Sequence, residues 1–233
     1  RQLEAAPLSG TVVPLLLPGE QPAADARPVE VVVDGGALVN WAIGVTEMLG
    51  PELPALLDAM ARGRTHDVVA SIAASTAAHQ GDLSWGLHNG VVCSEWVPYE
   101  RAGSVLEQGR RAFPAFPDSV LAQAPQFPFL REICRVWRVT KAPAAQRAIA
   151  RGDIPTLVIA GGYDAITSPR VAQAAAAPLA AATLVVIPGV GHFVVPKSAC
   201  AQRVMASFLA DPRAPDTDCV AALAPPPFKT RAP

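Results

Sequence analysis

The chain has 233 residues, of which 51% are hydrophobic and 17% charged, and its formal net charge is -1. This composition is typical of a globular chain with room for one or two domains, and it excludes a disordered one. A charge so close to zero gives no electrostatic reason to expect nucleic acid or an anionic membrane as a partner. No apolar run approaches the ~20 residues that cross a bilayer, so we expect no membrane span.

The first part of the chain predicts a β-hairpin followed by helices. Two β-branched runs, residues 11–17 and 29–33, flank a loop rich in Pro, Gly and Ala, which is typical of a hairpin with a long connection. A short strand-like run over 90–93 and proline-punctuated loops over 113–128 interrupt the helical patterns. We therefore expect residues 1–150 to form a mostly helical lid or cap. Its predicted helices are 37–49, 51–62, 65–80, 99–112 and 129–137.

The pattern changes after residue 150 to that of a parallel sheet. Residues 155–162 and 183–189 are unbroken apolar runs that end in glycine, as strands buried on both faces do. Helical patterns over 169–182 and 198–209 follow them. Strand, helix, strand, helix at this spacing predicts a βαβα unit with a right-handed crossover. The fold class is therefore α/β, with residues 151–233 as the sheet-containing part.

The four cysteines favour two disulfides. Cys93, Cys134, Cys200 and Cys219 include no C-x-x-C pair of the kind that binds zinc or does redox chemistry, and they allow three connectivities. An even count suits an extracytoplasmic chain. We favour pairing Cys93 with Cys134 and Cys200 with Cys219, since each pair closes a local segment, although four buried free thiols are the alternative.

An acid and a histidine follow the two strands of the predicted sheet. Asp164 lies in the loop after the first strand, and His192 lies in the glycine-rich loop after the second. Because functional residues gather at the carboxyl ends of parallel strands, the two side chains can meet there. A carboxylate that orients a histidine, which then removes a proton from a hydroxyl, is the logic of a catalytic triad. A turn-forming Asp and a structural His are the plainer interpretation of each residue alone.

The whole pattern resembles the C-terminal portion of tripeptidyl-aminopeptidase-like (TAP-like) α/β-hydrolases. The resemblance is carried by residues 155–169, by Gly189-Val190-Gly191-His192, and by Cys200 with Cys219. Ser168, inserted between Thr167 and Pro169, departs from the family's loop. The resemblance implies the last βαβα of the sheet, Asp164 as the acid, His192 as the base, and a secreted enzyme that releases short peptides from N-termini. It implies no cofactor and no metal.

The nucleophile of such an enzyme is not recognisable in the sequence. Its G-x-S-x-G elbow should precede the lid, and the nearest approach, residues 81–86, has the wrong spacing. We therefore expect the serine in a missing N-terminal half of the same hydrolase, so that this chain is a fragment that is inactive alone. Alternative functions are an esterase, a lipase, a proline iminopeptidase, or a non-catalytic subunit or binding module.

Three further residues are candidates for contact with the substrate, a peptide or a small amide or ester. Glu95 in the lid is a candidate for binding a free amine, although an inert surface glutamate is the plainer interpretation. Trp96 and Phe193 are candidates for lining the cleft, although lid aromatics are commonly core residues. The other histidines, His66, His79 and His88, show no pairing that suggests a metal.

Overall fold

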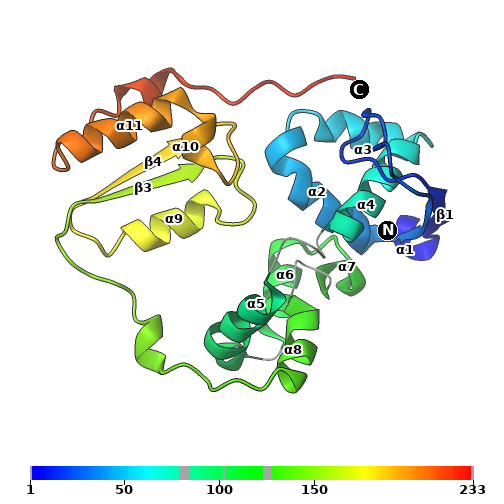
Figure 1. The fold of residues 1–233 in the computed structure, drawn as a ribbon, viewed down its shortest axis with the longest axis horizontal. Helices are drawn as coiled ribbons and strands as arrows, with labels where there is room; N and C mark the ends of the chain where they lie inside the picture. Colours follow the sequence, from blue (N-terminus) through cyan, green and yellow to red (C-terminus); the bar gives the residue numbers. More distant parts are fainter. Residues whose placement is uncertain (1, 79–83, 102, 123–126, 232–233) are drawn as a thin grey trace. The chain divides into compact units, whose positions relative to one another are not determined.

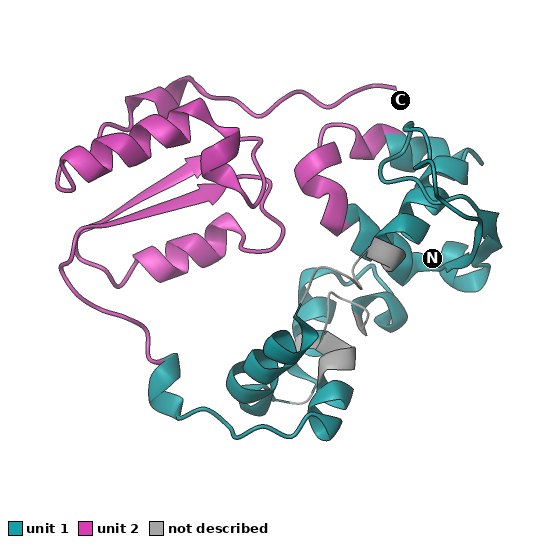
Figure 2. Ribbon diagram, in the orientation of Figure 1, with its two compact units in different colours: residues 1–42, 56–147, 233 teal, residues 43–55, 148–232 magenta. Residues whose placement is uncertain are grey.

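The computed structural model describes residues 2–78, 84–101, 103–122 and 127–231. The chain divides into two compact units (Figures 1 and 2). Unit 1 takes in residues 1–42 and 56–147, and unit 2 takes in 43–55 and 148–232. The segment 43–55 thus groups with a part of the chain that follows it by about a hundred residues. In the part of the chain that the structure describes, no helix is long and apolar enough to cross a membrane.

Unit 1 begins with helix α1 (Gln2–Ala5) and an antiparallel hairpin of β1 (Leu8–Val12) and β2 (Val29–Val33). In its register Leu8 lies opposite Val33, and Val12 lies opposite Val29. The second strand has the predicted bounds, but the first begins three residues before the predicted 11–17 and ends at Val12. Pro14 explains the shift, because a proline has no N–H to give to the ladder.

Helices make up the rest of unit 1. The run 90–93, predicted as strand-like, is instead the end of one helix and the start of a π-helix, η1, in which Val92 and Cys93 are buried. The region predicted as loops, 113–128, contains a short helix, α7, and the start of α8. Residues 79–80, the end of the predicted helix 65–80, lie outside the described residues. The end of α2 and the start of α3 fall in the segment 43–55, which groups with unit 2. The helices before residue 148 are α2 (Gly35–Leu49), α3 (Leu53–Ala61), α4 (His66–Ala78), α5 (Trp85–Val91), η1 (Val92–Trp96), η2 (Val97–Tyr99), α6 (Ser104–Ala112), α7 (Asp118–Ala122), α8 (Phe127–Val136) and η3 (Ala144–Arg147).

The core of unit 1 joins the hairpin loop to helices α2 and α4. The indole N–H of Trp41 donates to the Ser71 hydroxyl oxygen (2.9 Å), and that hydroxyl donates to the Leu16 carbonyl (3.1 Å). Ser71 is fully buried, so this chain of hydrogen bonds supplies the partners that a buried hydroxyl requires. All four tryptophans of the chain, Trp41, Trp85, Trp96 and Trp137, belong to unit 1.

Unit 2 is built on two parallel strands, β3 (Thr156–Gly161) and β4 (Ala182–Ile187). Thr156 lies opposite Ala182, and Gly161 lies opposite Ile187. Helix α9 (Pro169–Ala176) lies on one side of the strands, and α10 (Val194–Lys197) and α11 (Ala199–Ala210) lie on the other (Figure 1). A short helix, η4 (Asp218–Ala222), follows them. Parallel strands covered by helices make this an α/β arrangement.

Helix α9 is shorter than the predicted 169–182. It ends at Ala176 because Pro178 has no N–H to donate to the next helical hydrogen bond, although Ala177 still has helical backbone angles. The core of unit 2 lies between β4 and the last helices. It consists of Val185, Ile187, Val194, Cys200, Ala201 and Val204.

Candidate active site

The loops that leave β3 and β4 are joined to each other by backbone contacts. The Gly162 N–H donates to the Ile187 carbonyl (2.8 Å), and the Tyr163 N–H donates to the Val190 carbonyl (2.9 Å). Gly161 lies so close to the second loop that a Cβ there would overlap the carbonyl oxygens of Val190 and Gly191. The glycine that ends β3 therefore allows the two loops to meet.

Asp164 is fixed within its own loop. One carboxylate oxygen, Oδ1, accepts hydrogen bonds from the backbone N–H groups of Ile166 (2.8 Å) and Thr167 (2.7 Å). The other, Oδ2, accepts one from the Thr167 hydroxyl (2.8 Å). The Asp164 side chain is only 3% exposed. An aspartate that bonds the backbone two and three residues onward is a turn-forming one, so the plainer interpretation of Asp164 holds locally.

The same carboxylate also reaches His192. The distance from His192 Nδ1 to Asp164 Oδ2 is 3.0 Å, and Nδ1 is 3.2 Å from the Thr167 hydroxyl oxygen. An ionised carboxylate only accepts hydrogen bonds, so the proton of this contact belongs to Nδ1 of the imidazole. In the neutral imidazole, the second ring nitrogen, Nε2, then carries no proton. His192 is about one-third exposed, which leaves this ring accessible to a reactant.

The environment of Asp164 keeps its carboxyl group ionised. Burial alone raises the pKa of Asp164, but the hydrogen bonds from His192, Thr167 and Ile166 lower it by more, and the net pKa lies below the ordinary value for aspartate. The carboxylate thus carries a full negative charge next to His192 at neutral pH.

Other side chains surround the histidine. The Phe193 ring lies edge-on to the His192 ring, with centroids 5.2 Å apart, and it is 64% exposed. The Lys197 ammonium lies 5.8 Å from the centre of the Phe193 ring and forms an ion pair with Glu47 of α2. A Cβ at Gly191 would overlap the Glu47 side chain, so this carboxylate reaches the loop that holds His192.

Two of these neighbours were not among the residues predicted from the sequence. Thr167 bonds both Asp164 and His192, and its spacing of three residues after the aspartate was the available signal. Glu47 lies on a helix more than 140 residues upstream of His192. Nothing in the local sequence marks it, because only the fold of unit 2 brings it to the loop.

The candidates in the lid lie in unit 1. Glu95 and Trp96 belong to η1, and both side chains are exposed. His66 contacts Asp67, and His88 lies edge-on to Trp85, whereas His79 lies outside the described residues. Among the described residues, no group of three or more His, Cys, Asp or Glu side chains could hold a metal ion.

Both disulfides join the pairs that the sequence favours. Cys93 of η1 is bonded to Cys134 of α8 in unit 1, and Cys200 of α11 is bonded to Cys219 of η4 in unit 2. The alternative of free thiols does not apply, because the chain has four cysteines and all four are bonded.

The approximate serine elbow at 81–86 is only partly described. Residues 81–83 lie outside the described part, and Ser84 is an exposed residue that precedes α5. The described contacts of the His192 ring are with Asp164, Thr167 and Phe193.

Comparison with known proteins gives one family match. Residues 124–221 match the family model described as TAP-like protein. The matched segment contains α8, both strands of unit 2, Asp164 and His192, and three of the four cysteines. No match was found among curated proteins or among solved structures.

Proposed function

We propose that this chain supplies the acid and the base of a serine hydrolase, since residues 124–221 match the family model described as TAP-like protein. Asp164 is the acid and His192 is the base. The observation that carries the proposal is the 3.0 Å contact between His192 Nδ1 and Asp164 Oδ2, made by a buried carboxylate whose other oxygen is occupied by two backbone N–H groups.

The mechanism follows from the position of the proton on the His192 imidazole, which the contact with Asp164 fixes at Nδ1. With its proton held at Nδ1 by Asp164, His192 accepts the proton of a serine hydroxyl at Nε2 as that oxygen attacks a carbonyl carbon. The positive charge that develops on the imidazole is stabilised by the ionised carboxylate. His192 then returns the proton to the leaving group, and a water molecule, activated in the same way, releases the acyl group.

We place the nucleophilic serine outside these 233 residues, because no G-x-S-x-G elbow is recognisable in their sequence. The partner is the N-terminal half of the same α/β-hydrolase, and the chain is inactive without it. The oxyanion donors come from that half as well, since they belong to loops near the nucleophile.

The proposed substrates are peptides with a free N-terminus, from which short peptides are released. Phe193 offers an exposed apolar ring next to the base, which suits contact with a substrate side chain. Glu95 and Trp96 are the proposed contacts from the lid, with the Glu95 carboxylate binding the free amine. Comparing tripeptidyl and aminoacyl amides with simple esters as substrates separates this activity from that of an esterase, a lipase or a proline iminopeptidase.

The proposed location is outside the cytoplasm. Both disulfides support it, because such bonds persist in oxidising compartments and are rare in reducing ones.

Labelling with a fluorophosphonate probe tests the proposed chemistry, because the probe reacts with an activated serine. We would label the 233-residue chain, the polypeptide translated from its whole parent reading frame, and the His192→Ala variant of each. We expect the label only in the whole polypeptide, on a serine before residue 1, and we expect it to be lost with His192→Ala. Labelling of the 233-residue chain that depends on His192 would place the nucleophile inside it. A whole polypeptide that takes no label at all would overturn the serine hydrolase itself.

A further inference from the structure

Positive charge is concentrated in one segment of unit 1. Residues 131–147 contain five Lys or Arg and one Glu, whereas the rest of the chain contains 14 Lys or Arg and 19 Asp or Glu. Arg131, Arg135 and Arg138 follow one another at intervals of four and three residues, the spacing that places side chains on one side of a helix. Helix α8 carries the first two, and Arg138 lies two residues beyond its last residue, Val136. A segment of this kind attracts an anion.

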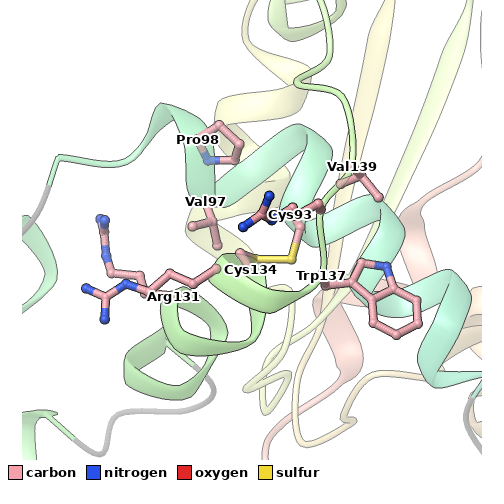
Figure 3. A pocket seen from close by; sticks show the side chains of 9 residues that line it. Cys93, Val97, Pro98, Arg131, Cys134, Trp137 and Val139 are labelled. Atoms are coloured by element: carbon pink, nitrogen blue, oxygen red, sulfur yellow. A yellow bond between two sulfur atoms is a disulfide. The ribbon is translucent and has the colours of Figure 1, made fainter.

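The three arginines line a single cavity of about 410 Å³. Cavities of this size are typical of sites for small organic ligands. Figure 3 shows the Cys93–Cys134 disulfide in the middle of the cavity, with Arg131 on one side of it and Trp137 on the other. The remaining lining residues, Val97, Pro98 and Val139, are apolar.

The walls of this cavity are tied to one another. The disulfide joins η1 to α8, and the segment after α8 returns along η1 and η2. The Ala142 N–H donates to the Ser94 carbonyl (3.0 Å), and the Ser94 hydroxyl donates to the Thr140 carbonyl (2.8 Å). The Lys141 ammonium donates to the Pro98 carbonyl (3.2 Å). The cavity is therefore formed before any ligand arrives, and a ligand does not have to order it.

The charges of the three arginines are neutralised to different degrees. Arg131 donates to the Glu100 carbonyl (3.1 Å), with the Glu100 carboxylate 4.0 Å away. Arg135 donates to both oxygens of Glu132 (2.9 and 2.8 Å) in an exposed pair. Among the described residues, Arg138 has no acidic partner. The cavity thus has about one uncompensated positive charge, which suits a ligand with one negative charge better than a polyanion.

The lining points to a carboxylate attached to a flat apolar body. A guanidinium binds a carboxylate through two parallel hydrogen bonds, which a single ammonium does not provide. Trp137 and Val139 are 41% and 40% exposed, and with the disulfide they offer an apolar surface against which a ring can lie.

We propose that this cavity in unit 1 binds small aromatic carboxylates, with Arg138 as the main contact for the carboxylate and Trp137 as the main contact for the ring. This site goes beyond the proposed hydrolase, since it contains neither Asp164 nor His192 and does not depend on their role.

Calorimetric titration of the full chain with three probes tests the charge requirement. Naphthylacetate, naphthylacetamide and naphthylmethylamine have one apolar body with a negative, a neutral and a positive group. We expect naphthylacetate to bind and to quench the tryptophan fluorescence. The two other probes should bind at least about tenfold more weakly, since a hydrogen-bonded charge pair is lost. Equal affinity for the acid and the amide, or no binding of the acid, would overturn the proposal.

Variants of the arginines test the location. We expect Arg138→Gln to weaken naphthylacetate binding about tenfold, with Arg138→Lys intermediate, because an ammonium keeps the charge but not the paired geometry. Arg111→Gln is the matched control, since Arg111 is an exposed arginine of α6 that does not line the cavity. Its affinity should equal that of the parent chain. Unchanged affinity in Arg138→Gln, or an equal loss in Arg111→Gln, would place the binding elsewhere and refute the site.

Discussion

The two units hold their charged side chains in opposite ways. In unit 2 the Asp164 carboxylate is buried, and each of its oxygens has two hydrogen-bond donors. In unit 1 the arginines around the disulfide lie on a helix and after it, and their ion pairs are exposed or long. A buried charge without hydrogen-bond partners would destabilise the folded chain, whereas an exposed charge is solvated by water until a ligand binds. The Asp164 site should therefore be more sensitive to small changes in the backbone than the arginine cavity.

The largest expected effect is on the buried carboxylate. In Asp164→Asn the amide would donate to His192 Nδ1, which would move the proton of the ring to Nε2, the atom that accepts the serine proton in the proposed mechanism. We expect the rate of fluorophosphonate labelling of the whole polypeptide to fall about 10⁴-fold. Asp153→Asn, at an exposed position of unit 2, is the control and should leave the rate unchanged. An unchanged rate in Asp164→Asn would remove Asp164 from the proposed triad.

Removal of the disulfides compares the stability of the two units. The Cys93–Cys134 bond joins residues 41 apart and the Cys200–Cys219 bond joins residues 19 apart. A longer loop gains more freedom in the unfolded chain when it is opened. We expect the double alanine variants to lose about 4 kcal/mol in unit 1 and about 3 kcal/mol in unit 2.

The two units can be followed separately during denaturation. Tryptophan fluorescence reports on unit 1, because all four tryptophans lie there, and hydrogen exchange of peptides from 148–232 reports on unit 2. If either double variant destabilised both units equally, the units would not unfold independently.

Replacing a strand glycine by alanine should change the free energy of unfolding by a smaller amount, and with opposite sign in the two units. Gly161→Ala would push a methyl group into the backbone of the loop that holds His192, and we expect a loss of about 1–3 kcal/mol. Gly10 of β1 has nothing within 4 Å of the position of an added Cβ. Gly10→Ala should raise the free energy of unfolding by about 0.5 kcal/mol through the unfolded chain. Urea titrations of both variants measure the difference, and a neutral Gly161→Ala would show that the loops can move apart.

The smallest expected effect concerns salt and acid. The pKa of Asp118 in unit 1 is lowered by its hydrogen bond with Arg110, and that of Asp164 is lowered although burial opposes it. A lowered pKa stabilises the folded chain above the ordinary pKa, and this stability is lost as the pH falls through the folded value. Because Asp118 is exposed, about 1 M salt should raise its pKa toward the ordinary value. The pKa of the buried Asp164 should stay unchanged, as NMR titration of both carboxyls would measure.

Local sequence predicts the sheet of unit 2 well, because an apolar run that ends in glycine leaves few alternatives. Both strands lie within two residues of their expected ends, and the loop after each holds the acid or the histidine. Contacts between distant segments were not predictable in this way. Glu47 reaches Gly191 only through the fold, and no spacing along the chain marks it.

Unit 1 shows why the same reasoning fails for short segments. The run Gly90-Val91-Val92-Cys93 has the β-branched content of a strand, yet it continues helix α5 into η1. There Cys93 is buried and bonded to α8, so tertiary packing outweighs the local preference. The spacing of the three arginines is visible in the sequence. The opposite wall of the cavity is not, because Cys93, Val97 and Pro98 lie about forty positions earlier in the chain.

The hydrogen-bond donors around Asp164 also affect the barrier to proton transfer onto His192. Water around a charge must reorient whenever that charge changes, and this reorientation is part of the barrier of a reaction. Three donors from the loop 166–167 already point at the Asp164 carboxylate before a proton reaches His192. They do not have to turn when the imidazole becomes positive. In the proposed mechanism, the dipoles around Asp164 are thus oriented once, when unit 2 folds, and not again in each turnover.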